Sequence, residues 1–204
     1  MGPDYRRKAA LMAIEEPAFE LLERSGVFQL RRYAPRVVAE TVVDGTLASA
    51  SAAGFRRLAR YIFGDNHGTP TAADTEGLPA AEREAQGRKI AMSAPVAIER
   101  VGGRWRVQFA MPRRCELEAL PRPRHPGIAL RMVPAQDTAV LMFSGLARAH
   151  TVDAQMRILL DWMAQRELEP LGAPQLARYN PPWTLPFLRR NEILIDYRTQ
   201  APQA

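Results

Sequence analysis

Apolar and polar residues alternate in several parts of the chain, and this pattern predicts strands. In residues 104–111, RWRVQFAM, one face carries Trp105, Val107 and Phe109 and the other carries polar side chains. The dipeptide Gly102-Gly103 before this segment predicts a tight hairpin turn. Further segments with strand character are 26–33, 36–43, 88–99, 126–133, 138–143, 174–180 and 191–197.

Two other segments have the helical period instead. The first opens at Gly45-Thr46 and ends at Gly64, and the second begins at about Thr151 and ends before Pro170. One face of each is apolar, which predicts helices that pack on a sheet. The apolar residues are Leu47, Ala50, Phe55, Leu58 and Ile62 in the first helix, and Val152, Met156, Leu159, Leu160 and Met163 in the second.

The order of these elements repeats: two strands, a helix and two strands occur twice, over about 26–112 and 126–198. We therefore predict an α+β fold in which eight strands close into a barrel, with two helices outside and a pseudo-twofold relation between the halves. Closing the sheet would remove its edges. We expect one domain over 15–200, a disordered leader over 1–14 and a disordered, Gly-containing loop over 64–88.

Charge and composition narrow the classes of function. The formal net charge is +6, carried almost wholly by arginine, and 47% of residues are hydrophobic. The arginines are scattered in pairs and do not interleave with aromatic residues, so we predict no nucleic-acid platform. No apolar stretch approaches the length of a membrane span, and the start lacks the apolar region of a secretory signal. We expect a cytoplasmic protein without a membrane partner and make no prediction of its oligomeric state.

Few residues point to catalysis or to a metal. We find no nucleophile elbow, phosphate-binding loop, metal-ligand spacing or suggestive pair of carboxylates. The lone cysteine, Cys115, follows Arg113 and Arg114, which could lower the pKa of its thiol, but a small apolar filler is the simpler interpretation. The three histidines, His67, His125 and His150, are expected at the surface. We therefore predict no catalytic residue and no metal ligand.

The segment YNPPWTLPFLRRNEI, from Tyr179 to Ile193, sets two large rings among three prolines and can be neither a helix nor a central strand. One interpretation is a stiff loop that plugs the core. The other is a stiff wall that receives a flat apolar ligand.

Three motifs in this order resemble the SOUL / heme-binding protein family. They are FQLRRYAPRVVAET, KIAMSAPV at 89–96 and YNPPWTLPFLRRNEILI at 179–195, and the resemblance covers about 16–198. It implies a distorted eight-stranded barrel with two helices, similar to the gyrase-inhibitor-like effector-binding domains. It also implies binding of heme or another tetrapyrrole in an apolar groove beside the first helix.

Carried onto this chain, the resemblance places three parts around that groove: the first helix, the KIAMSAPV segment and the proline-rich loop. Arginines, including Arg56 or Arg60, would meet the ligand's carboxylates. Heme or protoporphyrin would be a ligand that folding does not require, and no histidine stands in the early strand region where one relative places an axial ligand. The groove residues would be Phe55, Leu58, Tyr61, Ile62, Ile90, Met92, Pro182, Trp183, Leu185, Phe187, Arg189 and Arg190.

Alternative interpretations remain for these residues and for the function. Phe55, Leu58 and Ile62 have the spacing of ordinary core residues, and Arg189 or Arg190 could pair with a carboxylate such as Glu192. We therefore keep three hypotheses: a non-catalytic tetrapyrrole binder or carrier, a binding module for other flat hydrophobic molecules or a protein partner, and an enzyme acting on a small apolar substrate.

Overall fold

The computed structural model describes residues 14–69, 76–77, 79 and 87–199. Nearly all of the predicted leader and the middle of the predicted 64–88 loop lie outside these described residues. In the described part, no helix is long and apolar enough to cross a membrane.

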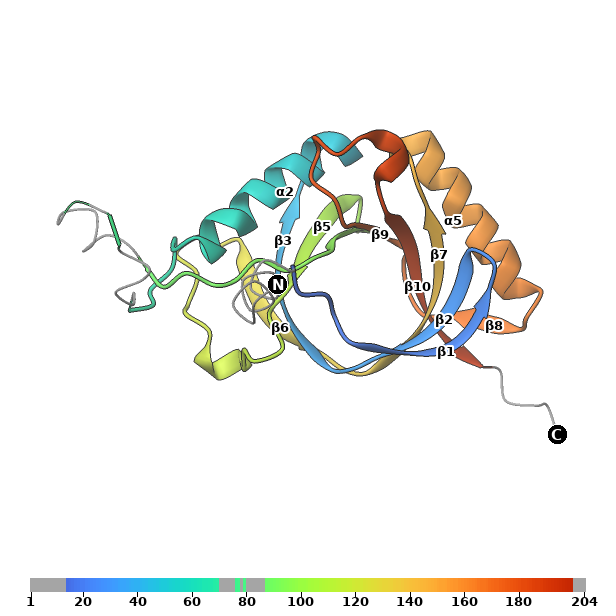
Figure 1. Cartoon of the computed structure of the whole chain (residues 1–204), viewed down its shortest axis with the longest axis horizontal. Helices are drawn as coiled ribbons and strands as arrows, with labels where there is room; N and C mark the ends of the chain where they lie inside the picture. The colour runs from blue at the N-terminus through green and yellow to red at the C-terminus, as the bar shows by residue number, and fades with distance from the viewer. Residues whose placement is uncertain (1–13, 70–75, 78, 80–86, 200–204) are drawn as a thin grey trace, which may run out of the picture.

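Ten strands form one strongly curved antiparallel sheet, and two helices cover its outer side (Figure 1). The order across the sheet is β1-β2-β7-β10-β9-β4-β5-β3-β6, and β8 pairs with β10. The strands are β1 (Phe19–Ser25), β2 (Phe28–Tyr33), β3 (Arg36–Val43), β4 (Val96–Val101), β5 (Arg104–Ala110), β6 (Ile128–Val133), β7 (Gln136–Phe143), β8 (Leu168–Pro170), β9 (Gln175–Arg178) and β10 (Asn191–Thr199).

The α+β class is confirmed, but eight strands in a closed barrel are not: the sheet is open and has two further strands, β1 and β8. Each of the eight predicted segments overlaps an observed strand. β1 escaped prediction because its sequence, FELLERS, does not alternate and all seven residues are exposed. β8 has only three residues. The internal repeat stays a prediction.

The two helices begin in different ways. In α2 (Leu47–Ile62), the Thr46 hydroxyl accepts a hydrogen bond from the Ser49 amide and the Ser49 hydroxyl accepts one from the Thr46 amide, which makes a capping box. Gly64 follows α2 with a φ of 113°, as a glycine that ends a helix often does. α5 (Ala149–Ala164) starts two residues before the predicted Thr151, and no side-chain hydrogen bond caps it.

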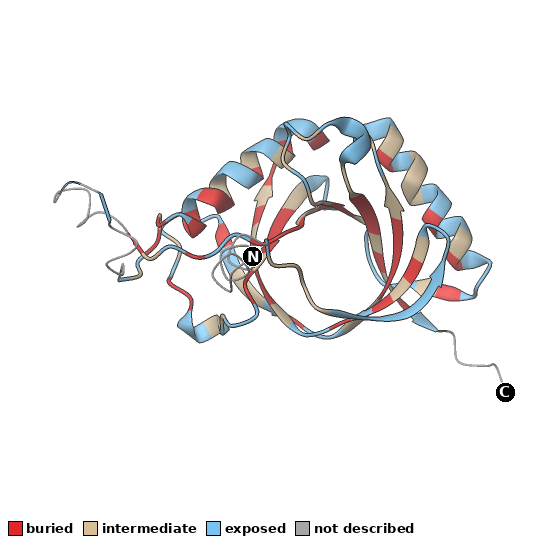
Figure 2. Ribbon diagram, viewed as in Figure 1, coloured by how far each residue is buried: buried red, intermediate tan, exposed pale blue. Residues whose placement is uncertain are grey.

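The two faces of the sheet differ in chemistry. The outer face and the inward sides of the helices form the apolar core, where buried positions concentrate (Figure 2). The inner face is rich in polar side chains that pair with one another. There, Arg106 of β5 bonds to Glu99 of β4 (Nη1–Oε1 2.8 Å). Buried polar residues there are Gln29, Arg31, Thr138 and Glu192 from β2, β7 and β10, and Glu99 and Gln108 from β4 and β5.

The hairpin between β4 and β5 forms as predicted. Val101 is paired with Arg104, so Gly102 and Gly103 alone make the turn, and both have positive φ (55° and 81°). Such angles are strained for other residues, which explains the glycine pair.

Gly54 sets how closely α2 approaches β5. A Cβ atom added to this buried glycine would overlap the side chain of Val107, which is fully buried. We expect Gly54→Ala to destabilise the protein, because overpacking costs about 1–3 kcal/mol and outweighs a gain of about 1 kcal/mol in helix propensity. In a thermal melt, Tm should fall by about 3 °C per kcal/mol lost. Ala52→Ser on the exposed face of α2 is the control, and a higher Tm for Gly54→Ala than for the wild type would contradict this packing.

Candidate functional site

The proline-rich segment is a loop that joins β9 to β10, at the top of the view in Figure 1 between the upper ends of α2 and α5. It contains one short 3-10 turn, Pro186–Leu188. The Pro186 carbonyl accepts a hydrogen bond from the Gly145 amide (2.9 Å), which ties the loop to the connection that leads into α5. Pro181, Pro182 and Pro186 restrict the backbone further, because each fixes its own φ.

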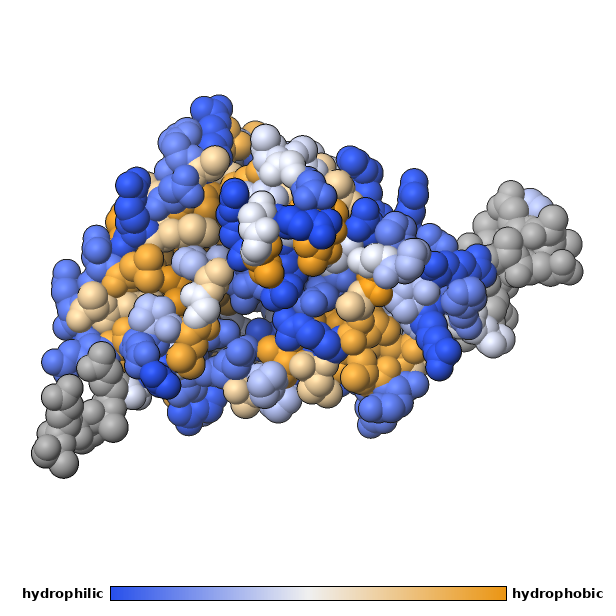
Figure 3. All heavy atoms as spheres, turned by 180° about the vertical axis from the view of Figure 1, so that it is seen from behind, coloured by the Kyte–Doolittle hydropathy of each residue, from blue (hydrophilic) through white to orange (hydrophobic). Residues whose placement is uncertain are grey.

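The loop presents its large apolar side chains to solvent. Trp183 is 82% exposed and Phe187 70%, while Leu185 and Leu188 are also more than half exposed. We call these four side chains the apolar platform. Large exposed rings on a stiff loop are typical of a binding surface. Elsewhere, on the side turned away from the view of Figure 1, apolar atoms form separate patches among hydrophilic ones (Figure 3).

Arg189 braces the loop from within. Its guanidinium donates to the carbonyl of Thr184 (Nε–O 2.8 Å) and to that of Pro182 (Nη2–O 2.5 Å). Both carbonyls flank Trp183, so this contact fixes the backbone on each side of the ring. Arg189 is therefore occupied by the loop itself.

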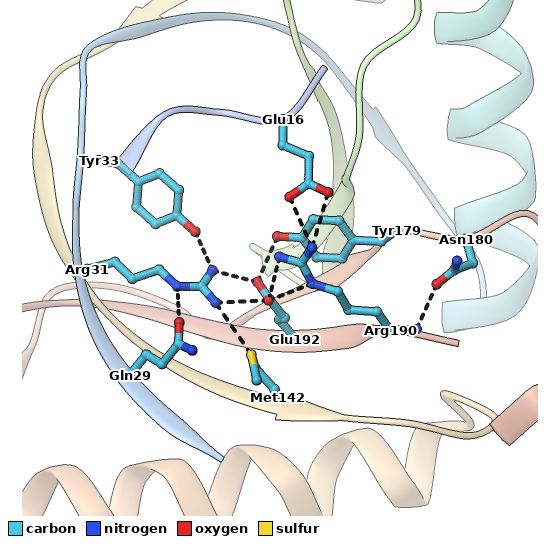
Figure 4. A network of polar contacts seen from close by, with 9 residues as sticks. All are labelled: Glu16, Gln29, Arg31, Tyr33, Met142, Tyr179, Asn180, Arg190 and Glu192. Carbon is cyan, nitrogen blue, oxygen red and sulfur yellow. Dashed lines mark hydrogen bonds and ion pairs between the residues drawn. The ribbon is translucent and has the colours of Figure 1, made fainter. Parts of the chain in front are cut away.

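Glu192 holds both ends of the loop (Figure 4). Tyr179, just before the loop, donates its hydroxyl to Glu192 Oε2 (2.7 Å), and Arg190, just after it, donates Nε to Oε1 (3.0 Å). Arg31 of β2 completes the set with two bonds, Nη1–Oε2 2.9 Å and Nη2–Oε1 3.0 Å. The Arg31 and Glu192 side chains are 1% and 0% exposed. We call Arg31, Tyr179, Arg190 and Glu192 the clamp.

Other residues surround the clamp. Arg31 donates to Gln29 and to the hydroxyl of Tyr33, and its guanidinium lies 4.3 Å from the ring centre of Phe19. Arg190 also bonds to both oxygens of Glu16 (3.1 Å each) and lies over the Tyr179 ring. Arg190 is therefore shared between β10 and the segment that precedes β1.

The electrostatic environment of the clamp favours the ionised form of Glu192. Burial alone would raise the pKa of Glu192, but hydrogen bonds from Arg31 and Tyr179 and the arginine charges outweigh it, so its pKa lies below the ordinary value. Burial, the nearby Glu192 charge and the bond to that carboxylate raise the pKa of Tyr179, which stays a hydrogen-bond donor. The clamp is thus an ionised carboxylate saturated by fixed donors.

One cavity lies on the inner side of the sheet, and a second adjoins it. The inner one has about 40 Å³ of room and is lined by Tyr33, Arg36, Val38, Gln108, Tyr179 and Leu194 among others. The second, which we call the strap groove, has about 330 Å³ and lies between residues 15–18, the β2–β3 turn and residues 110–118. A third space of about 490 Å³ lies beside Arg32, Asp137 and residues 196–199. None of these three is lined by α2 or by residues 180–190.

Comparison with known protein families shows to which family this chain belongs. The model of the SOUL heme-binding protein family matches residues 14–196, nearly the whole chain. The chain belongs to the SOUL heme-binding protein family. No curated protein matches it in sequence.

Solved structures similar to this SOUL protein show the same fold at low sequence identity. The EcmrR C-terminal domain has a TM-score of 0.55 and 9% identity, over 84% of this chain and 97% of that one. A hydrolase from Listeria innocua has a TM-score of 0.53 and 7% identity, over 95% and 97%. EcmrR in its DNA complex has a TM-score of 0.58 and 11% identity, over 87% and 60%. These likenesses support the effector-binding-like architecture and carry no conclusion about activity.

The structure separates the site residues suggested by the SOUL resemblance into three groups. Leu58, Tyr61 and Ile62 are at most 1% exposed and Ile90 is 7% exposed, so these belong to the core and do not line an open groove. Phe55 and Met92 are partly exposed, at 38% and 36%, and the Phe55 ring packs against Phe109. The exposed group is Pro182, Trp183, Leu185 and Phe187.

The two arginines expected to meet a ligand's carboxylates have other partners. Arg189 bonds to loop carbonyls, and Arg190 to Glu16 and Glu192. The pairing of Arg190 with Glu192 was the alternative left open. On α2, Arg56 and Arg60 are exposed, and no described carboxylate forms an ion pair with either.

Arg31 and Glu192, the buried members of the clamp, were not predicted as site residues from the sequence. No role was predicted for Arg31, although the alternation of Gln29, Arg31 and Tyr33 places three polar residues on one strand face. A polar strand face that could lie opposite Glu192 is the sequence signal from which the buried part of the clamp could have been predicted. Cys115 packs partly against the core, and burial raises the pKa of its thiol in spite of Arg114.

The site fits the flat porphyrin face of a heme better than it fits the iron. The platform offers flat apolar side chains for a porphyrin face, but residues 181–188 include no His, Cys, Met or Tyr. The loop can therefore supply stacking and shape, and no iron ligand.

The clamp yields a prediction for stability. Glu192→Gln leaves Arg31 and Arg190 without their shared carboxylate, and breaking a buried pair in this way costs about 3 kcal/mol. The free energy of unfolding, from urea denaturation, should fall by that amount. Glu169→Gln, at the exposed pair with Arg198, should leave the urea midpoint nearly unchanged. Equal effects of the two substitutions would contradict the clamp.

A second prediction concerns pH. Since the pKa of Glu192 is depressed in the folded protein, its ionisation stabilises the fold above about pH 4.3, the ordinary glutamate value, and this contribution is lost as pH falls through the lower folded pKa. The stability difference between wild type and Glu192→Gln should therefore shrink between pH 7 and pH 3. Urea midpoints at both pH values measure it, and a difference that grows in acid would overturn the assignment.

Proposed function

We propose that this SOUL protein binds heme or another tetrapyrrole, without catalysis, on the apolar platform beside α2. The observation that carries the proposal is the exposure of Trp183 and Phe187 on a loop that is held from within and at both ends. The family match supports the ligand class.

Rigidity is what makes the platform suited to a planar ligand. Its backbone is fixed by prolines, by Arg189 and by the clamp, so few backbone rotations remain to be lost on binding. A porphyrin face can then stack on rings that a fixed backbone carries. The exposed side chains leave open space for a ligand larger than any of the three cavities would admit.

Exposed arginines on α2 also support a tetrapyrrole bound on the platform. Arg56 and Arg60 are exposed on α2, where Arg56 directly follows Phe55, whose side chain is partly exposed, and Arg60 lies about one turn further along. We assign the propionate groups of a porphyrin to these two arginines, in place of Arg189 and Arg190, because guanidinium and carboxylate form charge-assisted hydrogen bonds.

A second candidate is a binding surface for other flat hydrophobic molecules or for a protein partner. The observation that favours it is that the platform is open to solvent, since its four residues line none of the three cavities. The two candidates differ in selectivity: the tetrapyrrole binder prefers porphyrins, while the general surface binds apolar dyes equally well.

Ring removal tests the proposal. Trp183→Ala and Phe187→Ala should each weaken binding of protoporphyrin and hemin by about tenfold, since each removes a stacking contact worth about 1.4 kcal/mol. Hemin and metal-free protoporphyrin should bind the wild type with similar affinity because the apolar face carries the contact. Absorbance titration at defined stoichiometry measures both.

The matched control is Ile158→Ala, which removes an apolar side chain of α5 that is 45% exposed. It should leave both affinities unchanged. Ring variants that bind as tightly as the wild type would reject the platform, and equal affinity for unrelated apolar dyes would favour the second candidate.

A further inference from the structure

Arg36, the first residue of β3, holds a buried hydrogen-bond donor without a partner. Its Nη1 atom is buried, and no described residue accepts a hydrogen bond from it. Its guanidinium lies 5.1 Å from the ring centre of Tyr33, a contact that satisfies no N–H group. A buried donor left unpaired costs about 1–3 kcal/mol, so such an atom calls for an acceptor that the described residues do not provide.

This arginine lies where two cavities adjoin. Arg36, Glu16, Pro17 and Ala110 line both the inner cavity and the strap groove. The inner cavity is large enough for a small polar headgroup or a few waters. The strap groove adds about 330 Å³, within the range of small-molecule sites.

The walls of the strap groove are largely apolar. Val37, Met111, Leu117 and Met132 line it, together with prolines and the thiol-bearing Cys115. An apolar chain or ring can pack against such walls, and methionine side chains adapt to its shape. The groove thus combines an apolar body with one charged end at Arg36.

No described acidic residue forms a hydrogen bond to Arg36, although the charge of Asp196, which accepts a bond from Thr138, acts on its guanidinium. Glu15 accepts a hydrogen bond from the Arg113 amide and lies 3.5 Å from its guanidinium, and Glu16 is bonded to Arg190. Glu116 and Glu118 are exposed at the rim, where water screens their charge. The buried charge that lacks a hydrogen-bonded counter-ion is therefore positive.

We propose that the strap groove is a second ligand site, which binds a small amphipathic carboxylate whose headgroup bonds to Arg36 and whose apolar body lies against Met111, Leu117 and Met132. The site is separate from the apolar platform, since the two share no residue. Burial lowers the pKa of Arg36, and a bound carboxylate would restore the charge balance that burial disfavours.

Octanoate, octanamide and octylammonium test the charge that the site selects. They have the same chain and differ in headgroup, and isothermal titration measures their affinities for the full-length protein. Octanoate should bind at least tenfold more tightly than either of the others. Equal affinities, or a preference for octylammonium in keeping with the acidic rim, would overturn the proposal, as would the absence of octanoate binding.

Single substitutions test whether the carboxylate headgroup of octanoate binds at Arg36. Arg36→Met should weaken octanoate binding at least tenfold, without lowering Tm in the absence of ligand, because it removes an unpaired buried charge. Arg157→Gln, on the exposed face of α5, makes the same change in net charge and should have no effect. Half-exposed Met132 gives a second, independent pair: Met132→Glu should weaken octanoate binding and Met132→Lys should strengthen it.

Cys115 reports the location, because it lines the groove and is the only cysteine of the chain. Octanoate should slow alkylation of Cys115 by iodoacetamide in the wild type and in Trp183→Ala, and should not do so in Arg36→Met. Octanoate binding that leaves the alkylation rate unchanged would place the ligand elsewhere and reject this site, whatever the outcome at the platform.

Discussion

The carboxylate of Glu192 is the contact on which the other features of this protein depend. It is fully buried, yet two arginines and a tyrosine donate to it, and these donors come from β2, from the end of β9 and from the start of β10. Ionisation of a buried glutamate is tolerable only with such saturation. The same contact fixes where the proline-rich loop leaves the sheet and where it returns. The exposed rings of Trp183 and Phe187 therefore stand on a rigid base.

The fold makes this possible by reversing the usual division of the two faces. Its apolar layer lies outside, between the sheet and the two helices, so the inner side of the curved sheet is free to carry polar residues. Charges there pair across strands: Arg31 with Glu192 on one side, and Arg106 and Arg131 with Glu99 and Glu40 on the other. Arg36 stands between them without a hydrogen-bonded carboxylate. This asymmetry is what distinguishes the strap groove from the rest of the inner surface.

Much of the fold could be predicted from the sequence because its signals are local. Alternation and β-branched residues located eight strands, and the Gly45-Thr46 and Gly102-Gly103 pairs marked a helix start and a turn. β1 could not be found in this way, because an exposed edge strand needs no apolar face. Its position depends on pairing with β2, which is a non-local contact.

The candidate site was predicted less well, for the same reason. The rings of the loop were visible in the sequence, but whether Leu58, Tyr61 and Ile62 face a ligand or the core depends on how α2 rotates against β5. The partners of Arg190 are likewise set by tertiary contacts: Glu16 lies 174 positions away in the sequence. Periodicity identifies an apolar face but does not say what covers it.

The central claim is that a clamped loop offers its rings to a planar ligand at the surface, and the most direct test is to map the bound ligand by NMR. Protoporphyrin shifts the resonances of nearby nuclei strongly through its ring current. We predict that the largest shifts occur at residues 182–188 and at Phe55 to Arg60 of α2, with little change around Arg31 and Glu192. Shifts concentrated on the inner face of the sheet, or on α5 away from the loop, would contradict the account.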